Sequence, residues 1–186
     1  PIYDNVAGCT HKFESLMRIR DQNGRLWFPN QFLPVSKEFR LYSPISCAMI
    51  NKVFDLFENR KESVSINLSA IDISAPEVVR MIFDRIEKLK HPENFIFEIL
   101  ESEAFSDQNI LTGFIQKVRE HHVKLAIDDF GSGYSNLLEI IKMRPDIIKI
   151  DGEIIKNLLN DPMNRQLMDV IIYMSNVFNV ALVAEY

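Results

Sequence analysis

Five short apolar runs of this chain each carry or precede a carboxylate or an amide, and these polar residues are its strongest candidates for chemistry. The runs recur roughly every 25 to 35 residues, the length of a strand, a helix and two loops. Polar groups at the carboxyl ends of successive buried parallel strands form the active sites of TIM barrels. Acidic side chains gathered at one rim repel each other unless cations lie between them, so the pattern predicts a metal site. The runs are Ser63–Leu68 with Asn67, Phe95–Ile99 with Glu98, Val123–Ile127 before Asp128 and Asp129, Ile147–Ile150 with Lys149 and before Asp151, and Val180–Ala184 before Glu185.

Lys149 and Asp151 share one face of their predicted strand, because side chains alternate along a strand. Ile148 and Ile150 lie on the other face, so in a barrel they would pack under helices while the charged pair enters the lumen. A lysine in that position loses hydration and needs a carboxylate or phosphate partner. The alternative is a purely structural lysine–aspartate pair at a strand end.

Asp128 and Asp129 are adjacent carboxylates that follow a buried strand. A site with two divalent ions is a good reason to tolerate their repulsion, because each ion can take an oxygen or share one. Taken alone, the dipeptide favours turn and helix-capping chemistry ahead of Phe130 and Gly131. The polar residues that accompany it favour the metal interpretation.

Glu98 lies within an apolar run, where a solvated surface does not explain it, whereas such a surface explains Glu101 and Glu103 more easily. Asn67 offers a neutral oxygen that hard divalent ions accept beside carboxylates; a turn or capping amide is an equally good interpretation. Glu185 is a candidate general base or metal ligand. The four histidines show no zinc spacing, so the oxygen-rich set favours magnesium, manganese or calcium.

Length and composition indicate one globular domain. At 186 residues the chain is short for a complete eight-unit barrel, which needs about 250. The net charge of −5 argues against a groove for a nucleic-acid polymer, although a small phosphate ester can bind where a metal reverses the local sign. Cys9 and Cys47 have no paired spacing, which is typical of a reduced, cytoplasmic protein. No apolar stretch approaches the roughly 20 residues of a membrane span, although a larger parent protein can still be membrane-tethered.

The expected elements alternate between strands and helices, with the strands parallel and buried on both faces. Alternation also predicts a strand at Phe13–Arg20 and a hairpin turn at Asn23-Gly24. Three prolines predict a loop with short helical turns between Trp27 and Pro44. An open doubly wound sheet is disfavoured, because functional residues follow at least five strands and no glycine-rich phosphate loop follows an early one. Helices are expected at 44–59, 76–90 with Ser74 as N-cap, 106–121, 135–142 and from 161 onward.

With these residues assembled, the chain closely resembles the EAL-domain family of cyclic di-GMP phosphodiesterases. The resemblance covers essentially the whole chain, and the motifs occur in the family's order and spacing. The motifs are Glu14-Ser15-Leu16, Pro29-Asn30-Gln31-Phe32-Leu33-Pro34, Asn67-Leu68-Ser69, Phe97-Glu98-Ile99-Leu100-Glu101-Ser102, Asp128-Asp129-Phe130-Gly131-Ser132-Gly133-Tyr134-Ser135, Ile148-Lys149-Ile150-Asp151 and Ala184-Glu185.

The resemblance implies an α/β fold, a modified TIM (β/α)8 barrel, with residues 1–186 as one EAL phosphodiesterase domain. It implies that the domain binds Mg²⁺ or Mn²⁺, with two ions in one site. By resemblance, Glu14, Asn67, Glu98 and Asp128 are ligands of one ion, and Asp129 and Asp151 help to hold a second.

The resemblance also assigns roles to residues around the ions. Lys149 orients the attacking water or the scissile phosphate, and Glu185 acts as a general base or a ligand. Leu16 and Arg18 contact the substrate, with Arg18 on a phosphate. Glu101 steadies the loop after Asp129, which the family uses for homodimerisation and for coupling to activity.

The implied reaction is metal-dependent hydrolysis of cyclic di-GMP to linear pGpG in bacterial signalling, and a GGDEF or sensor domain is an expected partner in the parent protein. The alternative is a catalytically inactive EAL domain that acts as a cyclic di-GMP receptor or partner-binding module. Three departures from the family pattern are Ser15 for alanine, Ser132 for threonine, and Tyr186 where glycine is usual. The family's last strand and its helices are expected beyond Tyr186, so a barrel of these residues should show two open sheet edges.

Overall fold

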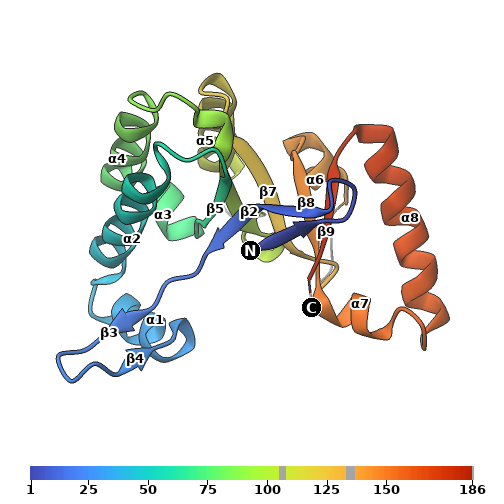
Figure 1. Cartoon of the computed structure of the whole chain (residues 1–186), viewed down its shortest axis with the longest axis horizontal. Coiled ribbons are helices and arrows are strands. Elements are labelled where there is room, and N and C mark those ends of the chain that lie inside the picture. The colour runs from blue at the N-terminus through green and yellow to red at the C-terminus, as the bar shows by residue number, and fades with distance from the viewer. Residues whose placement is uncertain (105–107, 133–136, 186) are drawn as a thin grey trace.

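A curled seven-stranded sheet forms the centre of the fold in the computed structural model, which describes residues 1–104, 108–132 and 137–185 (Figure 1). The strand order is β1-β2-β5-β6-β7-β8-β9, and every neighbouring pair is parallel except β1 with β2. This arrangement confirms the barrel-type α/β fold. The strands are β1 (Ile2–Asp4), β2 (Cys9–Ser15), β5 (Ser63–Asn67), β6 (Phe95–Leu100), β7 (Lys124–Phe130), β8 (Ile147–Ile150) and β9 (Ala181–Ala184).

Among the described residues, β1 and β9 are the edges of this sheet, and each is paired on one side. Residues of both strands line one groove of about 1060 Å³, so the curl brings the two edges to face each other across it. The expected open edges are therefore present.

Helices cover the outer face of the sheet in two groups (Figure 1). The first group packs on β5 to β7 through a continuous apolar core that includes Phe54, Ile82 and Phe97. The second packs on β7 to β9 around a smaller core that includes Ile148 and Ile171. The first group consists of α2 (Tyr42–Phe57), α4 (Pro76–Ile86) and α5 (Gln108–Glu120), and the second of α6 (Leu137–Met143), α7 (Gly152–Asn157) and α8 (Pro162–Phe178).

A separate apolar layer lies inside the curl. Ile96, Ala126 and Ile147 are buried together, and Val183 packs against them from β9. Because these residues sit at the inward-facing positions of four successive strands, they form a floor inside the sheet.

The strand predicted at Phe13–Arg20 is wrong beyond Ser15. β2 ends there, and the chain continues into a separate two-stranded sheet of β3 (Ile19–Arg20) and β4 (Leu26–Trp27). The alternation of side chains therefore spans two strands of different sheets. The turn at Asn23-Gly24 is confirmed, since Gly24 has φ +82° and its N–H donates to the carbonyl of Asp21 at 3.0 Å.

Between Trp27 and Pro44, where a loop with short helical turns is predicted, the helical part is longer than expected, because α1 (Pro29–Glu38) forms a helix of 10 residues. Pro29 stands in the first turn, where its missing N–H costs nothing, and the Gln31 side chain accepts the Phe28 N–H at 3.0 Å. The helix also accommodates Pro34. Prolines at these positions therefore did not prevent a helix.

Two short helices were not expected from the sequence, α3 (Ala70–Ser74) and α7. Ser74 ends α3 and does not cap the next helix, whose N-cap is Ala75. Two other short elements flank β6, the 3₁₀ turns η1 (Pro92–Asn94) and η2 (Glu101–Glu103). Within the described ranges, none of the helices combines the length and apolar character needed to span a bilayer.

Candidate functional site

The polar residues of the site follow the residues of the apolar floor by two positions along each strand, so they point to the same side of the sheet. Glu98 follows Ile96 by two residues on β6, and Asp128 follows Ala126 in the same way on β7. Since side chains alternate along a strand, each acidic residue points to the same side as the floor residue before it. The parallel register then brings these carboxylates to a common level at the carboxyl edge of the sheet. Lys149 after Ile147, and Glu185 after Val183, complete the pattern.

Lys149 lies at the centre of this group. Its side chain is 2 % exposed, and its Nζ lies 2.6 Å from Glu185 Oε1, 2.9 Å from Asp128 Oδ1, 3.2 Å from Glu98 Oε2 and 3.5 Å from Glu14 Oε1. One cation is therefore surrounded by carboxylates from four strands or strand ends. An ammonium group is buried at low cost only in such a setting.

Burial and mutual repulsion change the acidity of these groups. Burial raises the pKa of Glu98 to about 7, against the lowering effect of Lys149 and with further raising by Asp128 and Glu14. Burial alone would lower the pKa of Lys149, but the surrounding carboxylates of Glu98, Glu185 and Asp128 raise it above its usual value. In the absence of divalent ions, the single positive charge of Lys149 does not balance the negative charges of the carboxylates around it.

Glu185 and Asp129 show the same tendency. Burial raises the pKa of both carboxyls, and the hydrogen bond from Lys149 opposes the rise at Glu185. At Asp129, the neighbouring charges of Asp128 and Asp151 raise the pKa further. A divalent cation among these oxygens would reverse each of these shifts.

The carboxylates also have the spacing of metal ligands. Glu14, Glu98 and Asp128 each offer an oxygen, and these atoms lie within 4.8 Å of one another. Asp128, Asp129 and Glu185 form a second such group, so Asp128 belongs to both. All donors are oxygens, which suits hard divalent cations such as Mg²⁺ or Mn²⁺. The residues present therefore fit a site for two ions that share one ligand.

Asp129 needs an unusual backbone conformation to reach this position. Its φ is +54°, a left-handed value that is uncommon for a residue with a side chain. Two contacts hold the backbone nearby: the Asp129 N–H donates to Asp128 Oδ1 at 3.0 Å, and the Gly131 N–H donates to Glu101 Oε2 at 2.8 Å. Gly131 also has positive φ, and a Cβ there would overlap the Ile154 side chain.

Glu101 is buried, so its expected place on a solvated surface is wrong. Its Oε2 accepts the Gly131 N–H at 2.8 Å, just beyond Asp129. The loop continues into residues 133–136, which lie outside the described residues, as does Tyr186.

The structure brings Asn67 to the group but leaves Asp151 outside both carboxylate sets among the described residues. Asn67 Nδ2 donates to Glu14 Oε1 at 3.3 Å, and Asn67 lies in register with Glu98 on the adjacent strand. Asp151 Oδ1 accepts the Glu153 N–H at 2.7 Å and so caps α7. Its charge is nevertheless near enough to raise the pKa of Asp129.

Leu16 and Arg18 lie on the exposed segment that leaves β2 just after Glu14. The Leu16 side chain is exposed, and the Arg18 guanidinium stacks 4.8 Å from the centre of the Phe28 ring. Arg18 also donates to the carbonyl of Met17 at 2.7 Å. Within the described part of the chain, no hydrogen bond or ion pair joins Leu16 or Arg18 to the carboxylates around Lys149.

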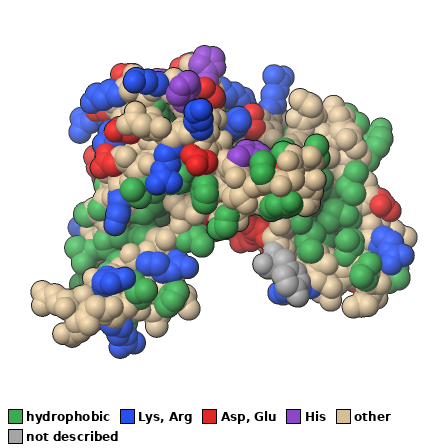
Figure 2. Space-filling view, in the orientation of Figure 1, with side chains coloured by type: hydrophobic (Ala, Val, Ile, Leu, Met, Phe, Trp, Pro, Cys, Tyr) green, Lys and Arg blue, Asp and Glu red, His purple; other side chains and the backbone are tan. Residues whose placement is uncertain are grey.

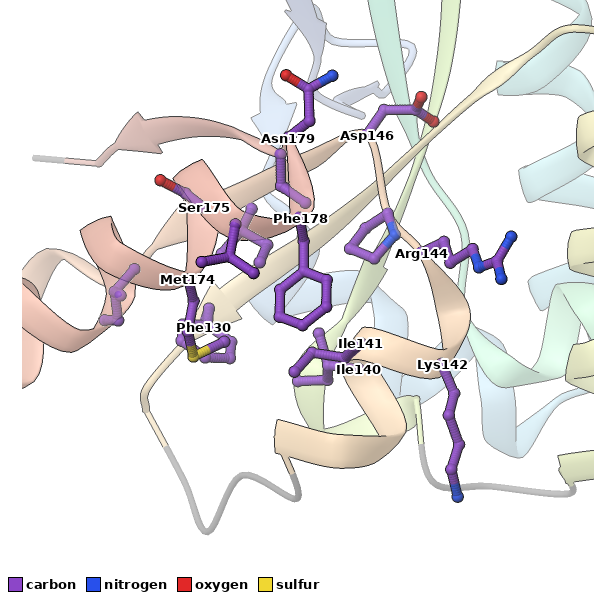
Figure 3. A pocket seen from close by; sticks show the side chains of 15 residues that line it. Phe130, Ile140, Ile141, Lys142, Arg144, Asp146, Met174, Ser175, Phe178 and Asn179 are labelled. Carbon is purple, nitrogen blue, oxygen red and sulfur yellow. The ribbon is translucent and has the colours of Figure 1, made fainter.

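Among the hollows lined by the described residues, the groove between the sheet edges reaches the carboxylates, and a second one on the outer face does not. The groove between β1 and β9 is lined by Glu14 and Glu185, so it opens onto the carboxylates. The other, of about 660 Å³, lies on the outer face between α6 and α8 (Figure 3). There Phe178 projects into an apolar space, while Lys142 and Arg144 point away from it. Of these two hollows, the groove therefore adjoins the carboxylates and the outer hollow does not.

Sequence reasoning missed three polar residues near the site, Tyr42, Asp72 and Glu103. They bind one another or the backbone that follows Asn67. The spacing Ser69-x-x-Asp72 matches a helix capping box and was an available signal for α3. Nothing in the local sequence indicated Tyr42 or Glu103.

Comparison with known proteins gives a consistent result. The chain matches the EAL domain family over residues 1–186. It is 28% identical over 179 residues to the cyclic di-GMP phosphodiesterase PdeF of Escherichia coli strain K12, covering 93% of this chain and 24% of PdeF. The chain therefore spans about a quarter of the length of that relative.

Solved structures agree on the fold. The PaMucR phosphodiesterase in complex with c-di-GMP superposes with a TM-score of 0.81 at 25% identity, covering 92% of this chain and 72% of that one. A Vibrio cholerae LapD structure that comprises an S helix, GGDEF and EAL, bound to c-di-GMP, gives a TM-score of 0.82 at 20% identity and covers 92% and 43%. The second likeness concerns the fold alone.

Proposed function

Because this chain belongs to the EAL domain family, we propose that it is a metal-dependent phosphodiesterase that hydrolyses cyclic di-GMP to linear pGpG. The observation that carries the proposal is the Lys149 ammonium surrounded by four carboxylates. Together with Asp129, these carboxylates form two overlapping sets with metal-ligand spacing. By the resemblance, each metal-ligand position of the family motifs that lies within this chain carries the matching residue type.

We assign the metal ligands as follows. A bound Mg²⁺ or Mn²⁺ pair supplies positive charge that neutralises the phosphate and lowers the pKa of water. The site is acidic and its substrate is an anion, so the positive charge of the ions is needed for the substrate to bind. Glu14, Asn67, Glu98 and Asp128 hold one ion, and Asp129 and Asp151 help to hold the other.

The remaining residues act on the water and the phosphate. Glu185 accepts the proton of the attacking water, and its hydrogen bond from Lys149 at 2.6 Å keeps its carboxylate oriented in the site. The water oxygen bonds to phosphorus in line with the ester bond that breaks, and the departing ester oxygen takes a proton from bulk water to become a free hydroxyl of the linear product. Lys149 donates hydrogen bonds that keep the carboxylates and the attacking water in place, and Arg18 and Leu16 bind the substrate above them.

The parent protein is proposed to carry further domains, since the chain covers about a quarter of PdeF. A GGDEF or sensor domain is the expected partner, as in the LapD structure. We also propose homodimerisation through the loop after Asp129, where the Glu101–Gly131 bond offers a link to the site. Turnover of this second messenger assigns the domain to the cytoplasm.

The test is to incubate the chain with cyclic di-GMP and Mn²⁺ or Mg²⁺ and to follow pGpG by chromatography. We expect product only with the metal, none with EDTA, and a loss of about 100-fold or more in Glu14→Gln. Glu93→Gln, an exposed carboxylate on η1, is the matched control and should leave turnover unchanged.

The receptor alternative gives a different result in the same experiment. A chain that binds cyclic di-GMP in EDTA, and yields no pGpG with either metal, is a binding module and contradicts the proposal. Circular dichroism of each variant shows whether a lost activity reflects lost structure.

A further inference from the structure

The backbone that directly follows Asn67 is held at three consecutive amides. The Leu68 N–H donates to the carbonyl of Glu98 at 2.9 Å, the Ser69 N–H to Asp72 Oδ2 at 2.9 Å, and the Ala70 N–H to Glu103 Oε2 at 2.8 Å. The first bond ties Asn67 to the strand that carries Glu98. The other two use side-chain carboxylates from separate elements.

Asp72 is one of these anchors and is completely buried. Its Oδ2 also accepts the Tyr42 hydroxyl at 2.7 Å and the Ser69 hydroxyl at 2.9 Å. Its Oδ1 is buried and has no hydrogen-bond partner in the described part of the chain. A carboxylate placed in this way is costly, so its bonds to Ser69 and Tyr42 must hold it firmly. It links the loop after β5 to the first turn of α2.

Glu103 is the other anchor and belongs to the same 3₁₀ turn as Glu101. Glu101 accepts the N–H of Gly131, which follows Asp129 at the end of β7. Glu103 accepts the N–H of Ala70, which follows Asn67 at the end of β5. The turn η2 therefore holds the loops that follow both neighbouring strands, β5 and β7. These are the loops next to three of the proposed metal ligands.

We propose that Glu103, together with Asp72, is a positioning residue for the Asn67 amide, and so sets the divalent-ion affinity of the site. The inference rests on the proposed function in assigning Asn67 as a ligand. Fixing the amides of Ser69 and Ala70 fixes the backbone from which the Asn67 side chain extends toward Glu14. Without the Glu103 bond, that backbone gains freedom that ion binding must then remove.

The test is direct Mn²⁺ binding to the chain without nucleotide, by electron paramagnetic resonance of the free ion or by calorimetry. We expect Glu103→Ala to raise the dissociation constant about tenfold. Glu103→Gln should restore it to within about twofold, because the amide oxygen still accepts the Ala70 N–H. Glu93→Ala is the matched control, since Glu93 lies on the 3₁₀ turn at the opposite end of β6.

A second readout is hydrogen exchange over residues 68–74 in EDTA, which should become faster in Glu103→Ala and return in Glu103→Gln. If Glu103→Ala does not fold, Tyr42→Phe tests the Asp72 anchor, with an expected rise of about threefold in the same constant.

The outcomes separate this inference from the proposed function. Wild-type protein that binds Mn²⁺ but forms no pGpG contradicts the phosphodiesterase proposal and leaves the positioning role measurable. Wild-type protein that binds no Mn²⁺ overturns both. Equal Mn²⁺ affinity in wild type and a folded Glu103→Ala overturns the positioning role alone.

Discussion

The two halves of the sheet are packed very differently. On the side of α2, α4 and α5, twenty buried apolar residues form one cluster, whereas on the side of α6 to α8 the corresponding cluster of described residues has eight. The second side also contains the apolar hollow at Phe178, and α8 exposes Val170, Tyr173 and Val177. Figure 2 shows hydrophobic side chains at the surface on this side, right in the view.

The candidate site draws on both halves. Asn67, Glu98 and Asp128 come from strands under the densely packed helices or at their border, while Lys149 and Glu185 come from the sparsely packed side. The salt bridges of Lys149 therefore join a densely packed half to a sparsely packed one, in addition to the strand pairing that runs through β7. Mutations can measure how much this ionic connection contributes to stability.

The largest effect on stability is expected from Lys149→Met. Removing the buried cation leaves the four carboxylates without the positive charge of Lys149, which should lower the free energy of unfolding by about 3–5 kcal/mol in EDTA. Mn²⁺ should recover part of the loss by replacing the missing charge. Urea unfolding in EDTA measures the loss of unfolding free energy, and urea unfolding with Mn²⁺ measures its recovery. If the variant is as stable as wild type in EDTA, the salt bridges of Lys149 do not stabilise the fold.

A matched pair of core truncations compares the halves directly. Ile82→Ala, in α4, should cost about 4 kcal/mol, because its dense surroundings cannot collapse into the space. Ile171→Ala, in α8 beside the existing hollow, should cost about 2 kcal/mol. Both side chains are buried and identical in type, so unfolding by urea isolates the packing. Equal losses would show that the halves are equally rigid.

The pH dependence of stability should reveal Glu98. Its pKa in the folded metal-free chain is about 7, above the ordinary 4.5, so the folded state holds this proton more tightly than the unfolded state does. The resulting stabilisation is fully present below pH 4.5 and is lost as the pH rises through about 7, a change of up to ~3 kcal/mol. The difference in unfolding free energy between wild type and Glu98→Gln, measured in EDTA, should fall over this range. A difference that is constant with pH would contradict the assignment.

The smallest effect is expected on the exposed face of α8. Tyr173→Lys should change the free energy of unfolding by less than about 0.5 kcal/mol, because the side chain is 71 % exposed. The same measurement on Lys156→Ala, an exposed residue of α7, provides a surface reference. A loss of more than 1 kcal/mol at Tyr173 would mean that this face is packed more tightly than its exposure indicates.

Much of the site followed from the sequence because it depends on local alternation. Glu98, Asp128 and Lys149 stand at inward positions of short strands, and a period of two is enough to place them on one side of the sheet. The order of strands and helices then indicated that these side chains meet at one edge. The barrel-type fold followed from the same periodicity.

The predictions from the sequence that were wrong concern residues whose partners are distant in the chain. Glu101 looked like a surface residue, because its partner is the Gly131 amide of the next strand's loop. The alternation of side chains continues from Phe13 to Arg20, although the chain changes sheets between them. The Ser15 hydroxyl donates to the carbonyl of Ser65 in the large sheet, whereas Arg20 belongs to the pair of β3 and β4. The Asp72 and Glu103 anchors likewise arise only when three segments are brought together.

The position of Lys149 has a consequence for the order of folding. Its nitrogen meets Glu14 across 135 residues of chain, and Glu185 joins it only after β9 pairs with β8. Closing so long a loop is entropically costly and slow compared with forming the local helices. The complete set of charges therefore exists only once the last described strand is in place, and uptake of a divalent ion during refolding should mark the end of folding, not its beginning.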